Sequence, residues 1–305
     1  MDSGLKRAIE QKVRAGERLT SDDGVALYDC DDLAWLGGLA HEVRTAKNGE
    51  VVFFAANRHV DTLEEALSVA PEGLTELHVL NGVQPNVAWP DYPRSLRALK
   101  DVLPDVSIKA FTAADIQWFE QISGLSADQI LDELVDAGLG SLTGGGAEAD
   151  WDTWSRIHRL AHSKGMKTPA TMLYGSIEDP VGHVLRLREL QDETRGFQVF
   201  VPLREQDDAV MPVESLKTFA VARLLFDNVP HVKCFGGTHE SSLAQLSLNF
   251  GVDDLDGYGT PDVLDLIRDA GFTPVERNAR YEVVQKFEGP TPLAERRREP
   301  QPMWS

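Results

Sequence analysis

The sequence is poor in cysteine: among its 305 residues only Cys30 and Cys234 are present. Two cysteines provide no disulfide framework and are typical of a chain that stays in a reducing compartment. Long apolar runs are also missing, since none approaches the roughly 20 residues that a membrane-spanning helix needs. The opening residues, Met1 to Lys6, lack a basic segment followed by an apolar one, so no signal peptide is expected. These absences predict a cytoplasmic protein without a membrane partner.

Positive charge is scarce as well. The chain has 30 Lys and Arg against 49 Asp and Glu, for a net charge of −19. Binding to a nucleic acid needs clustered cations that contact phosphates, so this balance argues against a nucleic-acid partner. The one basic cluster, Arg296-Arg297-Arg298, lies in a proline-rich tail. We interpret it as a solvated chain end.

The middle of the chain alternates short apolar runs with amphipathic stretches, which predicts parallel β/α units. The hydrophobic content of 42% is sufficient for a sizeable core. About seven strands are expected, and most of their runs are near-continuously apolar, as in a parallel sheet buried on both faces. We favour a closed or nearly closed α/β barrel over an open doubly wound sheet, partly because no glycine-rich turn follows the first strand. The main predicted strands are 51–55, 77–80, 106–111, 140–142, 168–174, 197–203 and 231–235, and the helices between them are 62–69, 91–102, 113–119, 126–137, 151–163, 177–194 and 213–228.

Three regions are predicted along the chain. Residues 1–48 form a helical extension, with helices at 4–17 and 31–46, and residues 49–288 form the barrel. A further helix near 261–270 and a short strand at 274–277 end this region. Residues 289–305, which begin Gly289-Pro290-Thr291-Pro292, are polar and rich in proline, and we expect them to be a disordered tail.

In a parallel barrel, functional residues gather where the strands end. The candidate acid–base groups at these ends are His59, Glu148, Lys233 and His239. The triple glycine 144–146 allows either a close approach of backbone to a ligand or simply a tight turn, and both interpretations stay open. His59, His239 and Glu240 do not have the spacing of a known metal site, so no metal is predicted. The pairs Asp253-Asp254 and Glu276-Arg277 are expected to be surface or capping residues.

Several segments at the strand ends and in the following helices carry a family resemblance. The segments are Asn57-Arg58-His59, Lys109-Ala110-Phe111-Thr112-Ala113, Ser141-Leu142-Thr143-Gly144-Gly145-Gly146-Ala147-Glu148, Ala170-Thr171-Met172-Leu173-Tyr174-Gly175, Leu187-Arg188-Glu189-Leu190-Gln191-Asp192-Glu193-Thr194, Asp227-Asn228-Val229-Pro230-His231-Val232-Lys233 and Asp253-Asp254-Leu255-Asp256-Gly257. They resemble aminofutalosine synthase, a radical S-adenosylmethionine enzyme of the futalosine route to menaquinone, and the related cyclic dehypoxanthinyl futalosine synthase shares part of the pattern. The resemblance runs in order from Leu19 to Val284, and it implies a TIM-like (β/α) barrel of the radical S-adenosylmethionine type.

The sequence departs from this family where the family binds its cluster. There, a loop after the first barrel strand carries three cysteines, spaced CxxxCxxC, that ligate a four-iron cluster. Here His59 is followed only by Val60-Asp61 before the predicted helix, and neither cysteine aligns with the loop. Two thiolates cannot replace three, so no iron–sulfur cluster and no reductive cleavage of S-adenosylmethionine are expected. Segments after Glu148, between Leu203 and Val213, and after Gly257 are shorter too.

Other residues on the same face still match the family or occupy its binding positions. The resemblance implies that they line a site for S-adenosylmethionine or another nucleoside. These predicted binding residues are Asn81, Gly82, Thr112, Gly144, Gly145, Gly146, Glu148, Tyr174, Gly175 and Glu178.

Three hypotheses follow from the resemblance and the departures. The first is a pseudoenzyme that acts by binding and partners a complete radical enzyme of the menaquinone pathway. The second is an enzyme with non-radical chemistry in the old nucleoside pocket, using the four acid–base candidates. The third, ordinary aminofutalosine synthase activity, needs a cluster from elsewhere. The sequence leaves open whether the chain is an enzyme.

Overall fold

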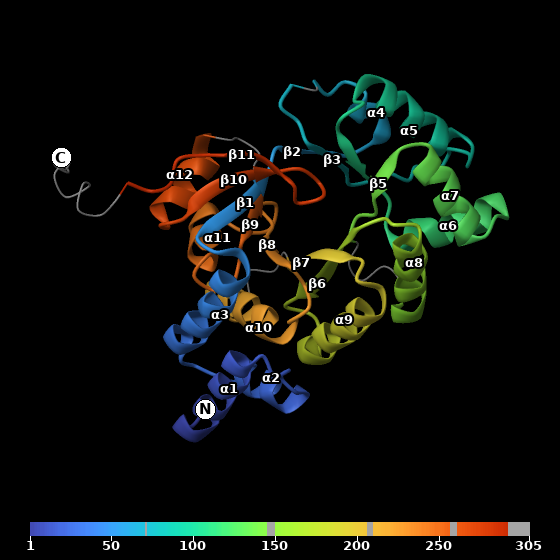
Figure 1. Cartoon of the computed structure of the whole chain (residues 1–305). Helices are drawn as coiled ribbons and strands as arrows, with labels where there is room; N and C mark the ends of the chain where they lie inside the picture. Colours follow the sequence, from blue (N-terminus) through green and yellow to red (C-terminus); the bar gives the residue numbers. More distant parts are fainter. Residues whose placement is uncertain (71, 145–149, 206–209, 257–260, 292–305) are drawn as a thin grey trace.

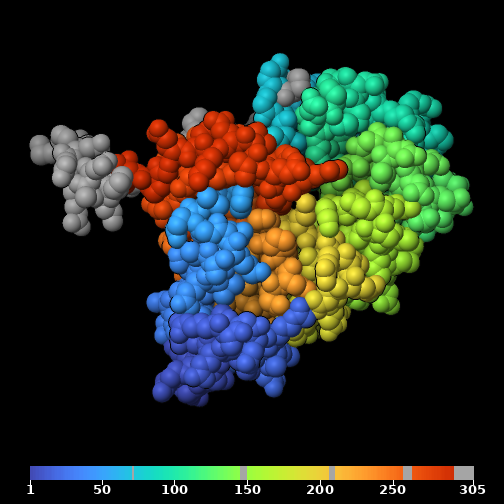
Figure 2. All heavy atoms as spheres, in the orientation of Figure 1, coloured from blue at the N-terminus to red at the C-terminus, as the bar shows by residue number. Residues whose placement is uncertain are grey.

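The architecture comes from a computed structural model, which describes residues 1–70, 72–144, 150–205, 210–256 and 261–291. The chain begins with three helices, α1 (Ser3–Ala15), α2 (Ser21–Tyr28) and α3 (Leu33–Asn48). Thr20 and Asp23 form a reciprocal capping box that starts α2. Both α2 and α3 pack against α10 (Pro212–Leu225). Figure 2 shows α1 and α2, in dark blue, together at the edge of the molecule.

In the described part of the chain, nine parallel strands, β1 to β9, surround a common centre. The ladders run in the order β2-β3-β4-β5 in one sheet and β1-β9-β8-β7-β6 in the other. The two sheets are continuous through the chain, because only Ala56 separates β1 from β2. Between β5 and β6 the described residues form no ladder, and the Ser141 hydroxyl donates instead to the Lys167 carbonyl at 2.8 Å. The strands are β1 (Val51–Ala55), β2 (Asn57–Val60), β3 (Glu76–Val79), β4 (Ser107–Lys109), β5 (Leu139–Ser141), β6 (Thr168–Tyr174), β7 (Phe197–Arg204), β8 (His231–Cys234) and β9 (Asp254–Asp256).

The helices after the first strand lie outside the ring of strands (Figure 1). This arrangement is a TIM-like (β/α) barrel, as the sequence predicted. Several helices begin at side-chain caps, such as Thr112 for α6 and Ser126 for α7. In addition to α10, these helices are α4 (Leu63–Ala66), α5 (Asp91–Val102), α6 (Ala113–Ser123), α7 (Ala127–Asp136), α8 (Trp151–Ser163), α9 (Pro180–Thr194), α11 (Ser241–Ser247) and α12 (Pro261–Asp269). No helix of the described ranges has both the length and the apolar character needed to cross a membrane.

A hairpin closes the end of the barrel where the strands begin. β10 (Thr273–Arg277) pairs parallel with β1, and β11 (Val283–Lys286) returns antiparallel beside it. The turn between them places the Tyr281 ring on the His231 ring, with centroids 3.8 Å apart and planes 5° apart. The hairpin therefore covers the N-terminal mouth and leaves the C-terminal mouth to the loops after the strands.

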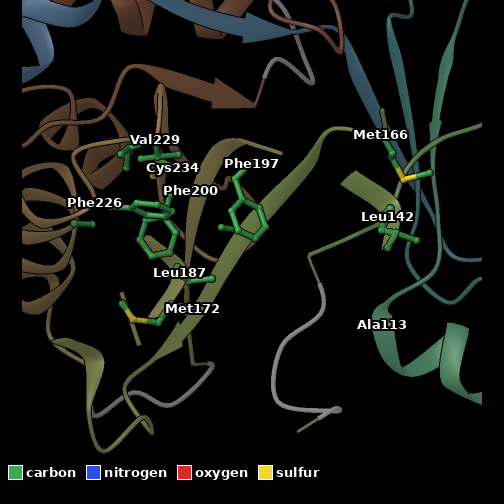
Figure 3. Close-up of a cluster of buried hydrophobic side chains, with 14 of the residues drawn as sticks. Ala113, Leu142, Met166, Met172, Leu187, Phe197, Phe200, Phe226, Val229 and Cys234 are labelled. Carbon is green, nitrogen blue, oxygen red and sulfur yellow. The ribbon is translucent and has the colours of Figure 1, made fainter. Parts of the chain in front are cut away.

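Several strands alternate between a polar inner face and an apolar outer face. In β3, Glu76 and His78 alternate with Leu77 and Val79, and the register places them beside Asn57 and His59 of β2. In the layer outside the strands, apolar side chains of β6, β7, α9 and the end of α10 pack together. Figure 3 shows Met172, Leu187, Phe197, Phe200 and Phe226 in this layer.

Some details of the fold differ from the sequence-based expectation. The strands β2, β9 and β11 and the helices α2 and α11 were not predicted, because β2 and β9 are polar and the helices are short. Asp253, Asp254 and Arg277, expected at the surface, are at most 1% exposed. The expectation was wrong because each of these charges has a buried partner of opposite sign. Residues 292–305 of the predicted tail lie outside the described residues.

Candidate functional site

The C-terminal mouth contains a cavity of about 510 Å³. It lies between the ends of β2, β8 and β9 and the helices α11 and α12. Its polar lining includes His59, His239 and Asp256, and the backbone of Gly236 and Gly237. A volume of this size suits a small organic ligand, and a few convergent polar groups are typical of such sites.

An ion pair stands at the base of this cavity. Lys233 of β8 lies 2.5 Å from Asp256 at the end of β9. The other groups on the Asp256 carboxylate are the Asn57 side-chain amide at 3.0 Å and the Gly236 N–H at 2.8 Å. Burial raises the pKa of Asp256, but the Lys233 ammonium outweighs this and lowers it to about 2. Asp256 is therefore a fixed anion at neutral pH, and Lys233 is held behind it.

Two histidines stack next to this pair. The ring of His59 lies on the ring of His78, with centroids 4.7 Å apart. Burial lowers the pKa of His59, against the attraction of Asp256, and burial lowers the pKa of His78 to about 4. Both rings are therefore neutral at pH 7. Asn57 lies 3.2 Å from Nε2 of His59, so this nitrogen accepts the amide hydrogen.

Below the histidines, charges continue along the barrel axis. Glu76 is fully buried and accepts from Lys109 at 2.6 Å, Arg277 at 2.5 Å and His78 at 2.9 Å. Burial alone raises the pKa of Glu76, but Lys109 and Arg277 hold it well below its usual range. Arg277 also bridges to Asp254 at 2.6 Å. The barrel interior is thus a connected set of ion pairs.

His239 and Tyr174 separate this cavity from a second one. The Tyr174 hydroxyl lies 2.8 Å from Nε2 of His239 and 2.7 Å from the Ser215 hydroxyl. Nδ1 of His239 faces the Phe235 carbonyl at 2.9 Å, and a carbonyl can only accept, so Nδ1 carries the proton and Nε2 accepts from Tyr174. The second cavity has about 470 Å³ and is lined by Tyr174, Gly175 and neighbouring residues.

The remaining sequence-predicted residues lie in more ordinary surroundings. Asn81 and Glu178 are exposed. Gly82 is buried, and a Cβ there would lie 2.9 Å from the Phe111 ring. The Thr112 hydroxyl caps α6 by accepting from the Asp115 N–H at 3.1 Å, so it stabilises the start of this helix.

The described part of the triple glycine packs against a strand. A Cβ on Gly144 would lie 2.0 Å from Thr171 of β6, and the Gly144 carbonyl accepts from the Thr171 hydroxyl at 2.9 Å. This contact accounts for the glycine at position 144. Gly145, Gly146 and Glu148 lie outside the described residues.

Several residues of the site were missed at the sequence level, namely Asn57, Glu76, His78, Lys109, Asp256 and Arg277. A signal for some of them is present. Glu76-Leu77-His78-Val79 and Asp254-Leu255-Asp256 alternate polar with apolar residues, the period-two pattern of a strand with two different faces. This alternation does not show which of these charged residues pair with one another across the barrel.

The residues present do not fit an iron–sulfur cluster. Cys30 follows α2 and Cys234 ends β8, and each is 1% exposed. Burial raises the pKa of the Cys234 thiol to about 12, whereas a cluster ligand has to be a thiolate. Within the described ranges no group of three or more His, Cys, Asp or Glu could hold a metal ion. In place of a cysteine loop, Thr62 caps α4 immediately after β2.

Comparison with known proteins gives close relatives, although no family model matches the chain. Aminodeoxyfutalosine synthase of Streptomyces coelicolor is 54% identical and covers 99% of this chain and all of the relative. The Thermus thermophilus enzyme of the same name is 34% identical over 92% of this chain and 96% of the relative. A cyclic dehypoxanthine futalosine synthase from Halalkalibacterium halodurans is 27% identical over 94% of this chain and 96% of the relative.

The Streptomyces alignment also shows how much shorter this chain is. It spans 387 positions, whereas this chain has 305 residues, so at least 82 positions are gaps in this chain.

Solved structures confirm the fold. The crystal structure of HydG, a maturase of the FeFe-hydrogenase, has a TM-score of 0.71 at 15% identity and covers 92% of this chain and 77% of that one. Methylornithine synthase (PylB) has a TM-score of 0.61 at 15% identity, over 83% of this chain and 87% of that one. These likenesses concern the barrel alone.

Proposed function

The chain belongs to the aminodeoxyfutalosine synthase family, and from that premise we propose that it acts by binding, without radical chemistry, in the futalosine route to menaquinone. The observation that carries this proposal is the direct passage from β2 into α4. His59 lies near the end of β2, and Thr62 already caps α4. Only Val60 and Asp61 lie between them, which gives no place for three thiolates.

The proposed ligand is a nucleoside of the kind the family handles, in the cavities at the C-terminal mouth. Two cavities of about 510 and 470 Å³ lie on either side of the Tyr174–His239 contact. Asp256 supplies a hydrogen-bond acceptor for a polar ligand. The proposed partner is a complete radical enzyme of the same pathway, which would carry out the chemistry that this chain lacks.

Anaerobic reconstitution with iron and sulfide tests the absence of radical chemistry. We expect iron analysis and electron paramagnetic resonance to find no stoichiometric cluster, because the only two cysteines are buried, one between α2 and α3 and the other in β8. A stoichiometric four-iron signal would overturn the proposal and restore ordinary synthase activity as the explanation.

A thermal-shift panel tests nucleoside binding. The ligands are S-adenosylmethionine, S-adenosylhomocysteine, 5′-deoxyadenosine and aminofutalosine, and one of them at about 100 times its dissociation constant stabilises the fold by about 2.7 kcal/mol. His59→Ala should reduce the response, while His41→Ala on α3, away from the mouth, should keep it. If none of the four ligands shifts unfolding, the nucleoside part of the proposal fails.

Co-purification with a complete aminodeoxyfutalosine synthase tests the partner. We expect the two purified proteins to elute together in size-exclusion chromatography. Separate elution at concentrations of tens of micromolar contradicts the partner proposal and leaves the nucleoside test unaffected.

A second candidate function is non-radical acid–base catalysis in the same cavity. The observation that favours it is the convergence of neutral His59 and anionic Asp256, with Lys233 behind them. His59 would act as the base through Nε2, with the substrate displacing the Asn57 amide from that nitrogen, since a neutral imidazole can accept a proton. Turnover of a nucleoside substrate that survives His59→Ala unchanged would exclude this role.

A further inference from the structure

A third cavity lies at the opposite end of the barrel from the candidate site. It has about 410 Å³ and is bordered by residues that precede or begin β3 to β7, among them Thr75, Ser107 and Lys167. The β10–β11 turn, residues 278–282, forms its remaining wall. We name it the basal cavity. The candidate function uses the C-terminal mouth and gives this end no role.

Four cationic side chains border the basal cavity, against two carboxylates. The cations are Lys100, Lys109, Lys167 and Arg280, and the carboxylates are Asp105 and Glu282. Glu282 already accepts a hydrogen bond from the Asn278 amide at 2.7 Å. In a chain with a net charge of −19, an excess of cations around a cavity runs against the overall composition.

Packing fixes the position of one of these cations. The stem of Lys100 lies against Gly138, where an added Cβ would come within 2.3 Å of the Lys100 side chain. Its ammonium donates to the carbonyls of Pro104 at 2.7 Å and Val106 at 2.9 Å. An ammonium has three N–H groups, so among the described residues one remains for a ligand.

The other cations differ in how far they are engaged. Lys109 is committed to Glu76 and contributes little more than background charge. Lys167 donates to the Arg195 carbonyl at 2.8 Å, which leaves two N–H groups. The Arg280 guanidinium makes no hydrogen bond or ion pair in the ranges that the structure describes, and it is exposed on the turn. Lys100, Lys167 and Arg280 are therefore the groups available to an incoming anion.

We propose that the basal cavity binds a small organic anion that carries carboxylate or phosphate groups, held by Lys100, Lys167 and Arg280. Charged hydrogen bonds from ammonium and guanidinium groups are the strong contacts that such oxygens make in proteins. A cavity of this volume admits a small metabolite. The site is independent of the proposed nucleoside binding, because it lies at the other mouth.

The test is isothermal titration calorimetry of the full chain with inorganic phosphate and, separately, with succinate, at an ionic strength held constant with sodium chloride. We expect saturable binding of at least one probe, and the responding probe distinguishes phosphate from carboxylate recognition. Arg280→Gln and Lys167→Gln should each weaken binding about tenfold or more, because each removes a charged hydrogen bond. Both residues are at the surface, and unchanged unfolding midpoints without anion confirm that the variants fold.

Lys286→Gln is the matched control, since it removes the same charge from β11 of the same hairpin, outside the cavity lining. It should bind the probe like the unchanged chain. Failure of both probes to saturate overturns the proposal. Equal weakening by Lys286→Gln and Arg280→Gln also overturns it, because the anion would then sense only overall charge.

Discussion

The axis of the barrel is lined by charged side chains, whereas the layer between its strands and helices is packed with apolar ones. Around the axis, Glu76, Lys109, Lys233, Asp256 and Arg277 form ion pairs at 2.5 to 2.6 Å. In the outer layer near β6 and β7, the packing is apolar (Figure 3). TIM barrels usually fill their centre with branched apolar side chains.

The two regions should differ in how much they contribute to the stability of the fold. Buried ion pairs add little net stability compared with apolar residues of similar size, because removing both charges from water is costly. The outer layer, by contrast, gains stability from each buried methylene. The four predictions that follow compare the free energy of unfolding that is lost when charged or apolar contacts are removed.

Arg277→Met should have the largest effect. It breaks two buried ion pairs at once, with Glu76 and Asp254, each of which accepts an Arg277 hydrogen bond. Glu76 keeps Lys109, whereas Asp254 loses the cation of its ion pair. Breaking one buried pair costs about 3–5 kcal/mol, and here two are broken. Urea unfolding at pH 7 measures the loss. A loss below about 1 kcal/mol would mean that water reaches these charges and that the axis is not a dry ionic core.

Lys233→Met should cost about 3–5 kcal/mol at pH 7, because it leaves Asp256 charged without its ammonium partner. In the unchanged chain the folded pKa of Asp256, about 2, lies below its ordinary 3.8. Its stabilising contribution is therefore complete above about pH 4 and is lost as the pH falls from there toward 2. Unfolding curves collected across this range should show that loss only when Lys233 is present.

The double variant Lys233→Met with Asp256→Asn is the control. It removes both charges, so much of the lost stability should return. If the double variant is no more stable than Lys233→Met alone, the loss comes from packing of the lysine stem and not from the stranded charge.

Leu187→Ala samples the apolar layer. Leu187 of α9 is fully buried, and truncation of such a residue costs about 2–5 kcal/mol through lost burial and the cavity left behind. The measured loss should be the same at pH 7 and at pH 5, because no charge is involved. A marked dependence on pH would show that the two regions are coupled.

Arg18→Ala should have the smallest effect. It removes ion pairs of the same kind as those at the axis, but these are exposed to water. Arg18 joins Asp192 at 2.5 Å and Asp227 at 3.1 Å on the surface. Exposed pairs contribute about 0.2–1 kcal/mol and weaken as salt is added. Unfolding in low salt and in 1 M sodium chloride should reveal a small difference that shrinks. An effect as large as that of Lys233→Met would remove the contrast between buried and exposed pairs.

The sequence identified most strands of the described barrel. Residues 51–55, 168–174 and 231–235 agree with β1, β6 and β8 to within a residue, since a short segment rich in apolar residues between turn signals indicates a buried strand. β2 and β9 were not predicted, because most of their residues are polar. Their strand conformation depends on partners elsewhere in the chain, such as Asp256 for Asn57.

For the candidate site, the sequence pointed to the C-terminal mouth of the barrel but not to the groups that meet there. His59 and His239 border one cavity, and Lys233 lies behind Asp256, which was not among the candidates. Thr112 was a candidate because it follows a strand, yet its hydroxyl caps α6. A position after a strand shows which mouth a residue faces, and only the three-dimensional contacts show whether its polar atoms are already used.

The sequence by itself determined the alternating β/α order, the family and the absence of a three-cysteine loop, because these depend on composition, periodicity and local order along the chain. Only the tertiary structure decided that Asp253, Asp254 and Arg277 are interior, that Glu76 links Lys109 to Arg277, and that a cation-rich cavity lies beneath the barrel. These features join residues up to about 200 positions apart, as with Glu76 and Arg277. A charge is tolerated in a core only beside its partner, and which residue becomes that partner is set by strand order and register.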